Sequence, residues 1–475
     1  MTDQQRHDQV GFASDGFFET PALDALARRG VVFRNAYSAG ATCVPARIGL
    51  MTGIQPRRLP RQSGTIALQE GVWTIAHALR ASGYDTALIG KMHFTPMHAS
   101  HGFDVMRTSE HLNANPHALR PDGSPDLDDY HSWLVGLGLA RWQEPFEVGA
   151  PPVVEPVRPP GTGRSPFPYR LEHHATTWIE NEVCSYLEQR RGDRPLFLVV
   201  SFPHPHPPLN PLGRYASQYD EAEIELPPDG FEVNEGLPEA FGSALRAGTG
   251  RFGGWRVHDH GEAALRSRVT KGRALVRHID DAIGRLLDRF PMDRTVVAFT
   301  SDHGDYAGHR GLAGKVPWIP FDDLVRVPLV LAGAGIASGR EVTSLVQSSD
   351  LPVTFCDMAA VELPAPIEEF DSRPLTPFTG AEPGVDDPDR PALFLYNSGW
   401  PGARLRSLKL ICHRPSGSRV LFDLDADPHE SVNLTEDSGY RSELAELEEL
   451  VETSLRRPPP LLPTFAPRSL RPEAV

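Results

Sequence analysis

Short apolar segments alternate with longer amphipathic segments along most of this 475-residue chain, and this alternation restricts the possible folds most strongly. Strands buried on both faces read as continuous apolar runs, and parallel strands need crossover helices between them. We expect strands at 31–37, 84–89, 196–202, 295–300 and 328–332, and helices at 45–52, 72–82, 172–190, 263–290 and 351–361. The pattern predicts an α/β fold with a large, mostly parallel sheet sandwiched by helices.

The pattern changes after a Pro-, Asp- and Gly-rich stretch. Strands are expected at 393–397, 404–412 and 419–423 with no helices between them, followed by a charged helix at 440–456. This order is typical of a small antiparallel sheet covered by one helix. We therefore divide the chain into a catalytic α/β domain (1–370), a linker (371–391) and a smaller C-terminal α+β subdomain (392–475).

Composition excludes several classes of partner. The 62 acidic and 47 basic residues give a net charge of −15, which repels nucleic acid and anionic membranes. No apolar run reaches the ~18 residues of a membrane span, and no signal peptide is visible, so the sequence as written predicts a cytoplasmic protein. The four cysteines, Cys43, Cys184, Cys356 and Cys412, form no CxxC pair and predict neither a disulfide framework nor a zinc ribbon.

Reactive residues follow the expected strands, where ligands bind in such sheets. Cys43 stands at the start of a helix with Arg47 one turn later. An isolated cysteine is usually a small buried apolar residue, but a helix N-terminus and a nearby arginine lower a thiol pKa and attract anions. The segment therefore predicts an anion-binding nucleophile.

A carboxylate and an imidazole stand side by side at the end of one expected strand. Asp302 and His303 end the strand at 295–300, and a carboxylate next to an imidazole can bind a divalent cation there. Asp3 and Gln4 alone would be read as part of an ordinary tail.

Lysine is scarce, so the positions of the lysines are informative. The chain has only Lys91, Lys271, Lys315 and Lys409, and the other 43 basic residues are arginine. Lys91 follows the strand at 84–89, and Lys315 follows the Asp302 segment. His204 and His206 follow the strand at 196–202. These positions predict a cationic cluster near Cys43.

Together these motifs resemble those of the type I, formylglycine-dependent sulfatases of the alkaline phosphatase superfamily. The segment 43–53 is similar to the family's C-x-P-S-R signature, with Ala46 in place of serine, and 301–305 is similar to S-D-H-G-[DE]. Residues 90–93 resemble G-K-x-H, and 201–207 resemble S-F-x-x-P-H-x-P. Further similarity at 20–26, 276–284, 326–328 and 421–434 extends the resemblance to nearly the whole chain, and it is weakest at 105–170.

The resemblance implies hydrolysis of a sulfate monoester to an alcohol or phenol plus inorganic sulfate. It implies that a formylglycine-generating enzyme converts Cys43 to formylglycine, whose hydrate is the nucleophile. It also implies a metal held by Asp3, Gln4, Asp302, His303 and residue 43. The oxygen-rich ligand set favours Ca²⁺, whereas His303 leaves Mn²⁺ or Mg²⁺ open.

The remaining roles also come from the resemblance. Arg47 supports the nucleophile and the metal, and His93 takes the proton that releases sulfate. Lys91, His206 and Lys315 bind the sulfate oxygens or the leaving oxygen, with His204 as the alternative to His206. Lys315 or His206 is the general acid.

Several alternatives stay open at this point. The same superfamily includes phosphonate monoester and phosphodiester hydrolases, although the Lys91–His93 pair favours a sulfatase. A choline-sulfatase-like enzyme fits 90–93 and the His-Pro-His element at 204–206. An inactive binding module would follow if Cys43 is never converted. Aryl, carbohydrate and choline sulfates all remain candidate substrates.

The resemblance also raises an expectation about the first strand. In the family, an apolar strand runs directly into the metal-binding pair that matches Asp3 and Gln4, but here only Met1 and Thr2 precede it. A central strand is costly to omit because its neighbours lose a ladder of hydrogen bonds and a buried face. We therefore expect that the true start lies upstream or that the chain is truncated.

Overall fold

The computed structural model describes residues 1–470 except 15, 60–67, 70, 111–126, 140–169, 225, 227–235, 248–253, 381–386, 397–398, 467 and 469. Much of the stretch 105–170, where the resemblance is weakest, therefore lies outside the described residues. The strands are β1 Gly30–Tyr37, β2 Asp85–Gly90, β3 Val105–Thr108, β4 Leu196–Ser201, β5 Trp255–Arg256, β6 Val296–Thr300, β7 Leu312–Ala313, β8 Leu329–Gly333, β9 Arg340–Gln347, β10 Ala392–Phe394, β11 Gly402–Leu405, β12 Leu408–His413 and β13 Ser418–Asp423.

The central sheet consists of two runs of strands, β6-β8-β1-β9 and β3-β2-β4. β1 pairs parallel to β9, and β2 pairs parallel to β3 and to β4. β8 runs antiparallel to both β1 and β6. The prediction of a mostly parallel sheet is confirmed. The direction of β8 was not foreseen, because a short apolar run carries no information about strand direction.

The first three residues join the two runs. Thr2 forms a parallel bridge with Ser301 beyond β6, and Asp3 forms one with Pro205 beyond β4. The amino group of Met1 donates to the carbonyl of Val200 at 2.8 Å. In β4 every residue except the last is only half-buried, and in β6 the first three residues are half-buried. Most of β1 and β8, in contrast, is buried. The first three residues of the chain therefore bridge the two runs at the carboxyl ends of β4 and β6.

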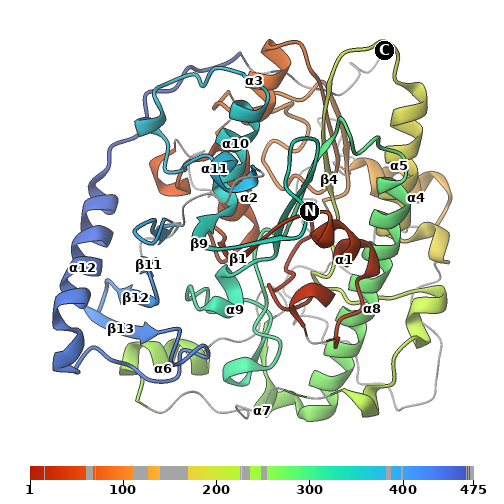
Figure 1. Cartoon of the computed structure of the whole chain (residues 1–475). Coiled ribbons are helices and arrows are strands. Elements are labelled where there is room, and N and C mark those ends of the chain that lie inside the picture. Colours follow the sequence, from red (N-terminus) through yellow and green to blue (C-terminus); the bar gives the residue numbers. More distant parts are fainter. Residues whose placement is uncertain are drawn as a thin grey trace, which may run out of the picture.

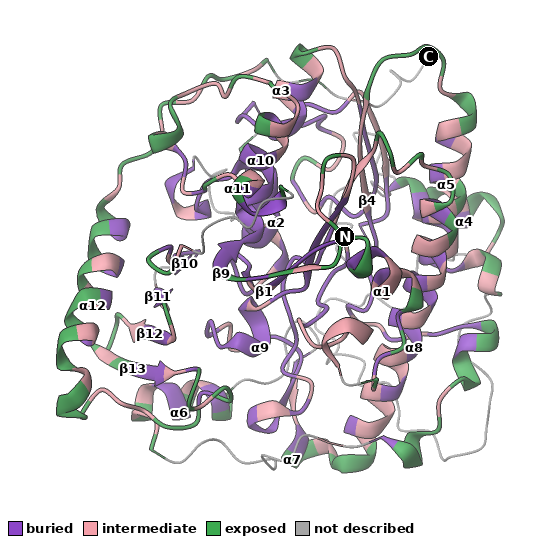
Figure 2. Cartoon of the chain, in the orientation of Figure 1, coloured by how far each residue is buried: buried purple, intermediate pink, exposed green. Residues whose placement is uncertain are grey.

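Helices cover both faces of this sheet (Figure 1). They are α1 Pro21–Arg28, α2 Cys43–Thr52, α3 Ile75–Ala81, α4 Asp129–Gly136, α5 Ala175–Gln189, α6 Glu239–Ala247, α7 Val257–His260, α8 Glu262–Leu287, α9 Asp322–Val325, α10 Leu351–Met358, α11 Thr376–Thr379 and α12 Arg441–Arg456. Val31 and Phe33 of β1 pack with α2, α3 and α10, whereas Val32 packs with α1 on the other face. Figure 2 shows α2 and α10 mostly buried. The predicted helical sandwich is confirmed.

The C-terminal part forms an antiparallel sheet in the order β10-β11-β12-β13, and α12 packs on it. One sequence prediction here is wrong. The single strand expected at 404–412 is a hairpin of β11 and β12, in which Arg406 adopts a left-handed φ of 54°. The pair Arg406-Ser407 contains no glycine and is not one of the dipeptides that favour a two-residue hairpin turn, so the sequence carried no strong hairpin signal.

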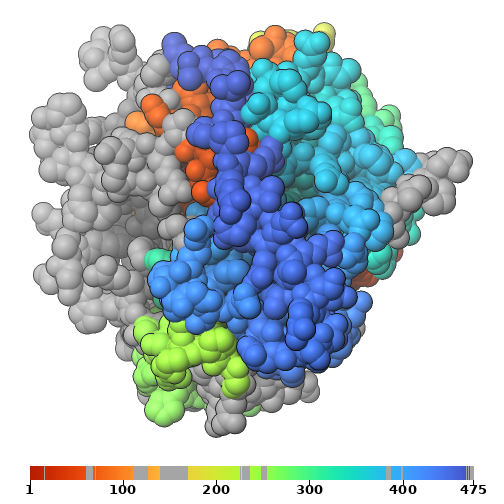
Figure 3. Space-filling model, turned by 90° about the vertical axis from the view of Figure 1, so that its left-hand side faces the viewer, coloured from red at the N-terminus to blue at the C-terminus, as the bar shows by residue number. Residues whose placement is uncertain are grey.

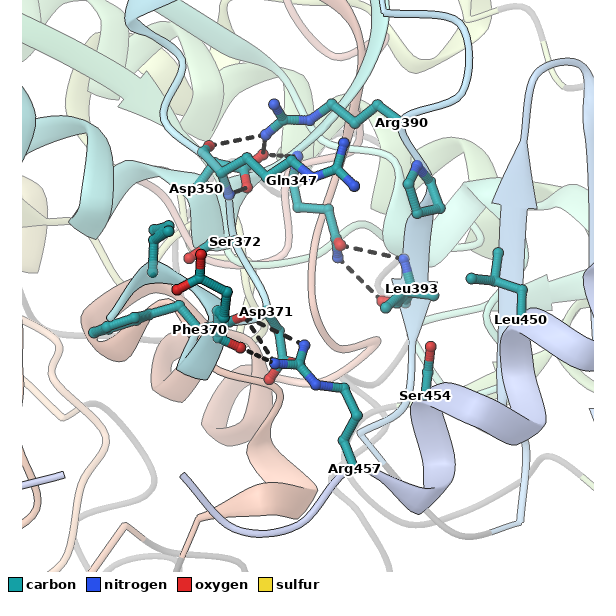
Figure 4. A pocket seen from close by; sticks show the side chains of 14 residues that line it. Gln347, Asp350, Phe370, Asp371, Ser372, Arg390, Leu393, Leu450, Ser454 and Arg457 are labelled. Atoms are coloured by element: carbon teal, nitrogen blue, oxygen red, sulfur yellow. Dashed lines mark hydrogen bonds and ion pairs between the residues drawn. The ribbon is translucent and has the colours of Figure 1, made fainter. Parts of the chain in front are cut away.

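The C-terminal part lies along one side of the catalytic part, as the blue band in Figure 3 shows. A pocket sits at this boundary (Figure 4). On its walls Arg457 pairs with Asp371 at 2.6 Å, and Arg390 pairs with Asp350 at 2.6 Å. Asp371 and Arg390 belong to the segment we assigned as a linker, and their contacts fix its described ends against both parts.

Candidate active site

The carboxyl ends of the parallel strands bring the sequence-predicted residues together. Cys43 is the first residue of α2, which follows β1, and Lys91 comes directly after β2. His206 follows β4, and Asp302 follows β6 by two residues. Asp3 lies between the ends of β4 and β6. The topology therefore collects five distant segments around one thiol.

Cationic groups surround the sulfur of Cys43. The Lys315 Nζ lies 3.0 Å from the Sγ, and the Lys91 Nζ lies 3.9 Å from it. The His303 Nε2 lies 3.2 Å away, and Asp3 Oδ1 lies 3.6 Å away. Both lysines and Cys43 are buried. Residue 43 thus faces more positive than negative charge inside the protein.

These charges act on the ionisation of the thiol. Burial by itself raises the pKa of Cys43, but Lys315, Lys91 and His303 outweigh burial and hold the pKa well below its usual value. Burial lowers the pKa of Lys91, but Asp3 and Cys43 reverse the shift and raise the pKa above its usual value. An anionic group at position 43 is therefore stabilised between two ammonium groups.

Arg47 organises the floor of the site. Its Nε donates to Asp302 Oδ2 at 2.9 Å, and one Nη donates to Asp3 Oδ2 at 3.0 Å. The other Nη donates to the Lys91 carbonyl and to Ser201 Oγ. The guanidinium is 2% exposed, so these contacts compensate its burial and fix the two carboxylates relative to α2.

Four side chains could share one metal ion. Asp3, Cys43, Asp302 and His303 offer ligand atoms that all lie within 4.8 Å of one another. Burial and Asp3 raise the pKa of Asp302 to about 6, so the two carboxylates repel each other. Gln4 lies beside them, and its buried Oε1 has no hydrogen-bond partner. This donor set fits a divalent cation, which would relieve the repulsion and complete the coordination of Gln4.

The histidines occupy different places. His93 and His206 both hydrogen-bond to Cys43 through their side chains. His204 stacks its ring on His174 instead, with the centroids 4.8 Å apart, and its Nδ1 faces the carbonyl of His206. Burial lowers the pKa of His93 and of His204 to about 4. At neutral pH these two rings are uncharged.

Sequence analysis missed two supporting residues. Ser201 accepts from Arg47, and its position at the end of a predicted strand could have indicated it. The buried carboxylate of Glu110 accepts from the backbone N–H groups of Met92 and His93, at 2.8–2.9 Å. These bonds hold His93 at a left-handed φ of 63°. Glu110 lies in the stretch where no motif was recognisable, so no signal pointed to it.

Comparison with known proteins identifies the family. A sequence model of the sulfatase family, described as "Sulfatase", matches residues 1–361. The chain belongs to the sulfatase family. A choline-sulfatase from Rhizobium meliloti is 30% identical over 435 residues, which cover 88% of this chain and 78% of that protein. An arylsulfatase from Clostridium perfringens is 25% identical and covers 95% of this chain and 92% of the relative.

Solved structures confirm the fold of this sulfatase. A phosphonate monoester hydrolase of Agrobacterium radiobacter superposes with a TM-score of 0.74 at 22% identity, covering 99% of this chain and 98% of that chain. The alkaline-phosphatase-like fold is therefore shown, and the family assignment makes this sulfatase a sulfuric ester hydrolase. Among the described residues, none of the helices is long and apolar enough to cross a membrane.

Proposed function

We propose that this sulfatase cleaves a small sulfate monoester with a formylglycine residue formed from Cys43. The observation that carries the proposal is the arrangement around the Cys43 Sγ, where the nitrogens of Lys315, His303 and Lys91 lie at 3.0, 3.2 and 3.9 Å. The Sγ marks the place of the formylglycine oxygens. Maturation requires a formylglycine-generating enzyme as partner. When formed, hydrated formylglycine supplies an oxygen that attacks sulfur and a second hydroxyl whose deprotonation releases sulfate.

The two lysines bind the sulfuryl group. Lys91 and Lys315 flank residue 43, so their ammonium groups can stabilise the negative charge that develops on the transferred oxygens and on the leaving oxygen. Lys315 or His206 donates the proton to the leaving alcohol as the S–O bond breaks. His204, whose ring stacks on His174, supports the loop that carries His206.

His93 serves the second half of the reaction. Its side chain reaches residue 43, and burial keeps the ring neutral at neutral pH, so it can accept a proton. It removes the proton from the remaining hydroxyl of residue 43, sulfate departs, and the aldehyde is restored.

Asp3, Gln4, Asp302 and His303 would hold a divalent cation together with residue 43. The cation would polarise the sulfuryl oxygens and lower the pKa of the nucleophilic hydroxyl. Three oxygen-bearing side chains favour Ca²⁺, and His303 keeps Mn²⁺ and Mg²⁺ as alternatives.

A substrate comparison tests the proposal. We expect a higher kcat/KM for 4-nitrophenyl sulfate than for a phenyl phosphonate monoester, because the fully buried Lys91 and the neutral His93 match a sulfatase. The second candidate, phosphonate monoester hydrolysis, is favoured by the Gln4 and His303 pair and by the structural similarity to a phosphonate monoester hydrolase. Faster turnover of the phosphonate would reverse the order. Choline sulfate belongs in the same panel because of the 30% identical relative.

A further inference from the structure

Asp305, the last residue of the segment 301–305, has no role in the mechanism above, although it lies beside the candidate metal ligands. Its carboxylate accepts four hydrogen bonds. Oδ1 accepts from the backbone N–H groups of Ala307 and Gly314 at 2.7 and 3.0 Å. Oδ2 accepts from Gln4 Nε2 at 2.5 Å and from the Arg268 guanidinium at 2.6 Å. All of its lone pairs are therefore occupied.

We propose that Asp305 is a positioning residue that sets the polarity of the Gln4 amide, so that Gln4 presents oxygen, and not nitrogen, to the cation. This inference rests on the proposed metal centre. The proposal follows from what each partner can offer. An ionised carboxylate only accepts hydrogen bonds, so the NH₂ group of Gln4 must turn toward it. The amide oxygen then points the other way, where the buried Oε1 lacks a hydrogen-bond partner.

The surroundings keep Asp305 an acceptor. Each carboxylate oxygen accepts two hydrogen bonds, and one of the four donors is the permanently charged guanidinium of Arg268, so no acceptor site is left for a proton. Arg268 itself comes from α8, which brings the long helix into contact with the site. The backbone of Gln4 is fixed as well, since its N–H donates to Asp302 Oδ1 at 3.0 Å. The remaining freedom of Gln4 is the orientation of its side-chain amide, and Asp305 sets that orientation.

The same residue reaches the sulfate-binding side of the site. Gly314, which donates to Asp305 Oδ1, is followed by Lys315, and the Nζ of Lys315 contacts Cys43. Asp305 therefore ties a candidate metal ligand and a candidate substrate lysine to one rigid carboxylate. Residues behind a ligand commonly control metal affinity by about 10–100-fold.

Exchanging the amide group of residue 4 and the acid group of residue 305 tests the proposal. In Asp305→Asn, the asparagine NH₂ can donate to Gln4 Oε1, which turns the glutamine NH₂ toward the cation. In Gln4→Glu, two carboxylates meet where a donor is needed. Both single variants should weaken Ca²⁺ binding by roughly 10-fold or more. The double variant Gln4→Glu with Asp305→Asn again pairs a donor with an acceptor and should recover most of the affinity.

The readout is the dissociation constant of Ca²⁺ alone, measured by calorimetry on full-length apo protein and checked by the Ca²⁺-dependent shift in melting temperature. Asp281→Asn is the matched control, because Asp281 also pairs with arginines, Arg277 of α8 and Arg214 of the segment 213–217, but is not among the candidate metal ligands or their contacts. If a single variant does not fold, recovery of folding and Ca²⁺ binding in the double variant still supports the proposal. Unchanged affinity in Asp305→Asn, or a double variant no better than the singles, overturns it. Wild-type protein that binds no Ca²⁺ and no Mn²⁺ would overturn the metal centre itself.

Discussion

Two buried clusters of charged residues in this sulfatase each pair a lysine with a carboxylate. In the candidate active site, Lys91 Nζ lies 2.7 Å from Asp3 Oδ2. At the boundary with the C-terminal sheet, Lys409 Nζ lies 2.7 Å from Asp322 Oδ1 and 2.7 Å from Glu430 Oε1. Lys91 and Lys409 are both fully buried. Burial of a lysine–carboxylate pair therefore does not by itself mark a catalytic site.

The groups around each lysine distinguish the clusters. Lys409 lies between two carboxylates and near the rings of Tyr37 and Phe394, at 5.9 and 5.2 Å from their centroids. In the candidate active site, the ammonium groups of Lys91 and Lys315 both contact the sulfur of Cys43. The Lys409 cluster fastens β12 to the catalytic part, whereas the two other lysines face a reactive side chain.

The largest expected effect is on turnover. Cys43→Ala should lower kcat by at least about 10³-fold, because it removes the nucleophile, and should leave the melting temperature nearly unchanged. Sulfate ester hydrolysis under steady-state conditions measures the first effect. Cys184→Ala, at a half-buried cysteine on α5, is the matched control and should retain wild-type kcat. Wild-type rates in Cys43→Ala would contradict the assignment of the nucleophile.

Lys409→Met should lower stability and leave turnover unchanged, the opposite of Cys43→Ala. It removes the ammonium group that lies between Asp322 and Glu430. These carboxylates keep Arg326 at 3.8 Å and Arg310 at 3.3 Å, so the free energy of unfolding should fall by about 2–3 kcal/mol. The folded enzyme should keep its kcat/KM, since Lys409 belongs to the cluster on β12 and not to the one around Cys43. Urea unfolding and activity measurements on the same preparation check both statements, with Lys271→Met as the control. Equal stability, or a selective loss of activity, would remove the distinction between the clusters.

The smallest expected effect is on the pH dependence of stability, and it concerns Asp280, a carboxylate held by backbone N–H groups. Asp280 of α8 accepts from the backbone N–H groups of Ala22 and Leu23 at the start of α1, and burial raises its pKa to about 6. Because the folded state binds more protons than the unfolded state between the two pKa values, this group loses stabilisation as the pH rises from about 4 to 6. The stability of Asp280→Asn relative to wild type should therefore increase over that range by about 1–2 kcal/mol. An equal difference in unfolding free energy between Asp280→Asn and wild type at pH 4.5 and pH 7, measured by urea unfolding, would contradict this prediction.

The sequence predicted the parts of this molecule that depend on local pattern. Apolar runs located β1, β2, β4, β6 and β8, and the residues after them located Cys43, Lys91 and Asp302. β9 was not predicted, because its segment REVTSLVQ mixes polar and apolar residues and has no continuous apolar run, although five of its eight residues are buried. The role of Asp280 as a cap for α1 was also hidden, since Asp280 and Ala22 are 258 residues apart in the chain.

The details of the site required the three-dimensional structure. Motifs suggested that Gln4 and Lys315 lie near Cys43, but not that Asp305 contacts the amide of one and the loop of the other. The left-handed backbone of His93 and its support by Glu110 depend on a contact across 17 residues with no local signature. Long-range hydrogen bonds of this kind have no sequence period and cannot be inferred from spacing.

The most direct test of the account is the mass of residue 43 in active enzyme. Trypsin cleavage after Arg34 and Arg47 releases residues 35–47, in which Cys43 is the only cysteine. Conversion to formylglycine lowers the mass of this peptide by about 18 Da. The account predicts that kcat, measured across preparations, rises in proportion to the converted fraction. Full sulfatase activity in a preparation that contains only unmodified Cys43 would contradict it.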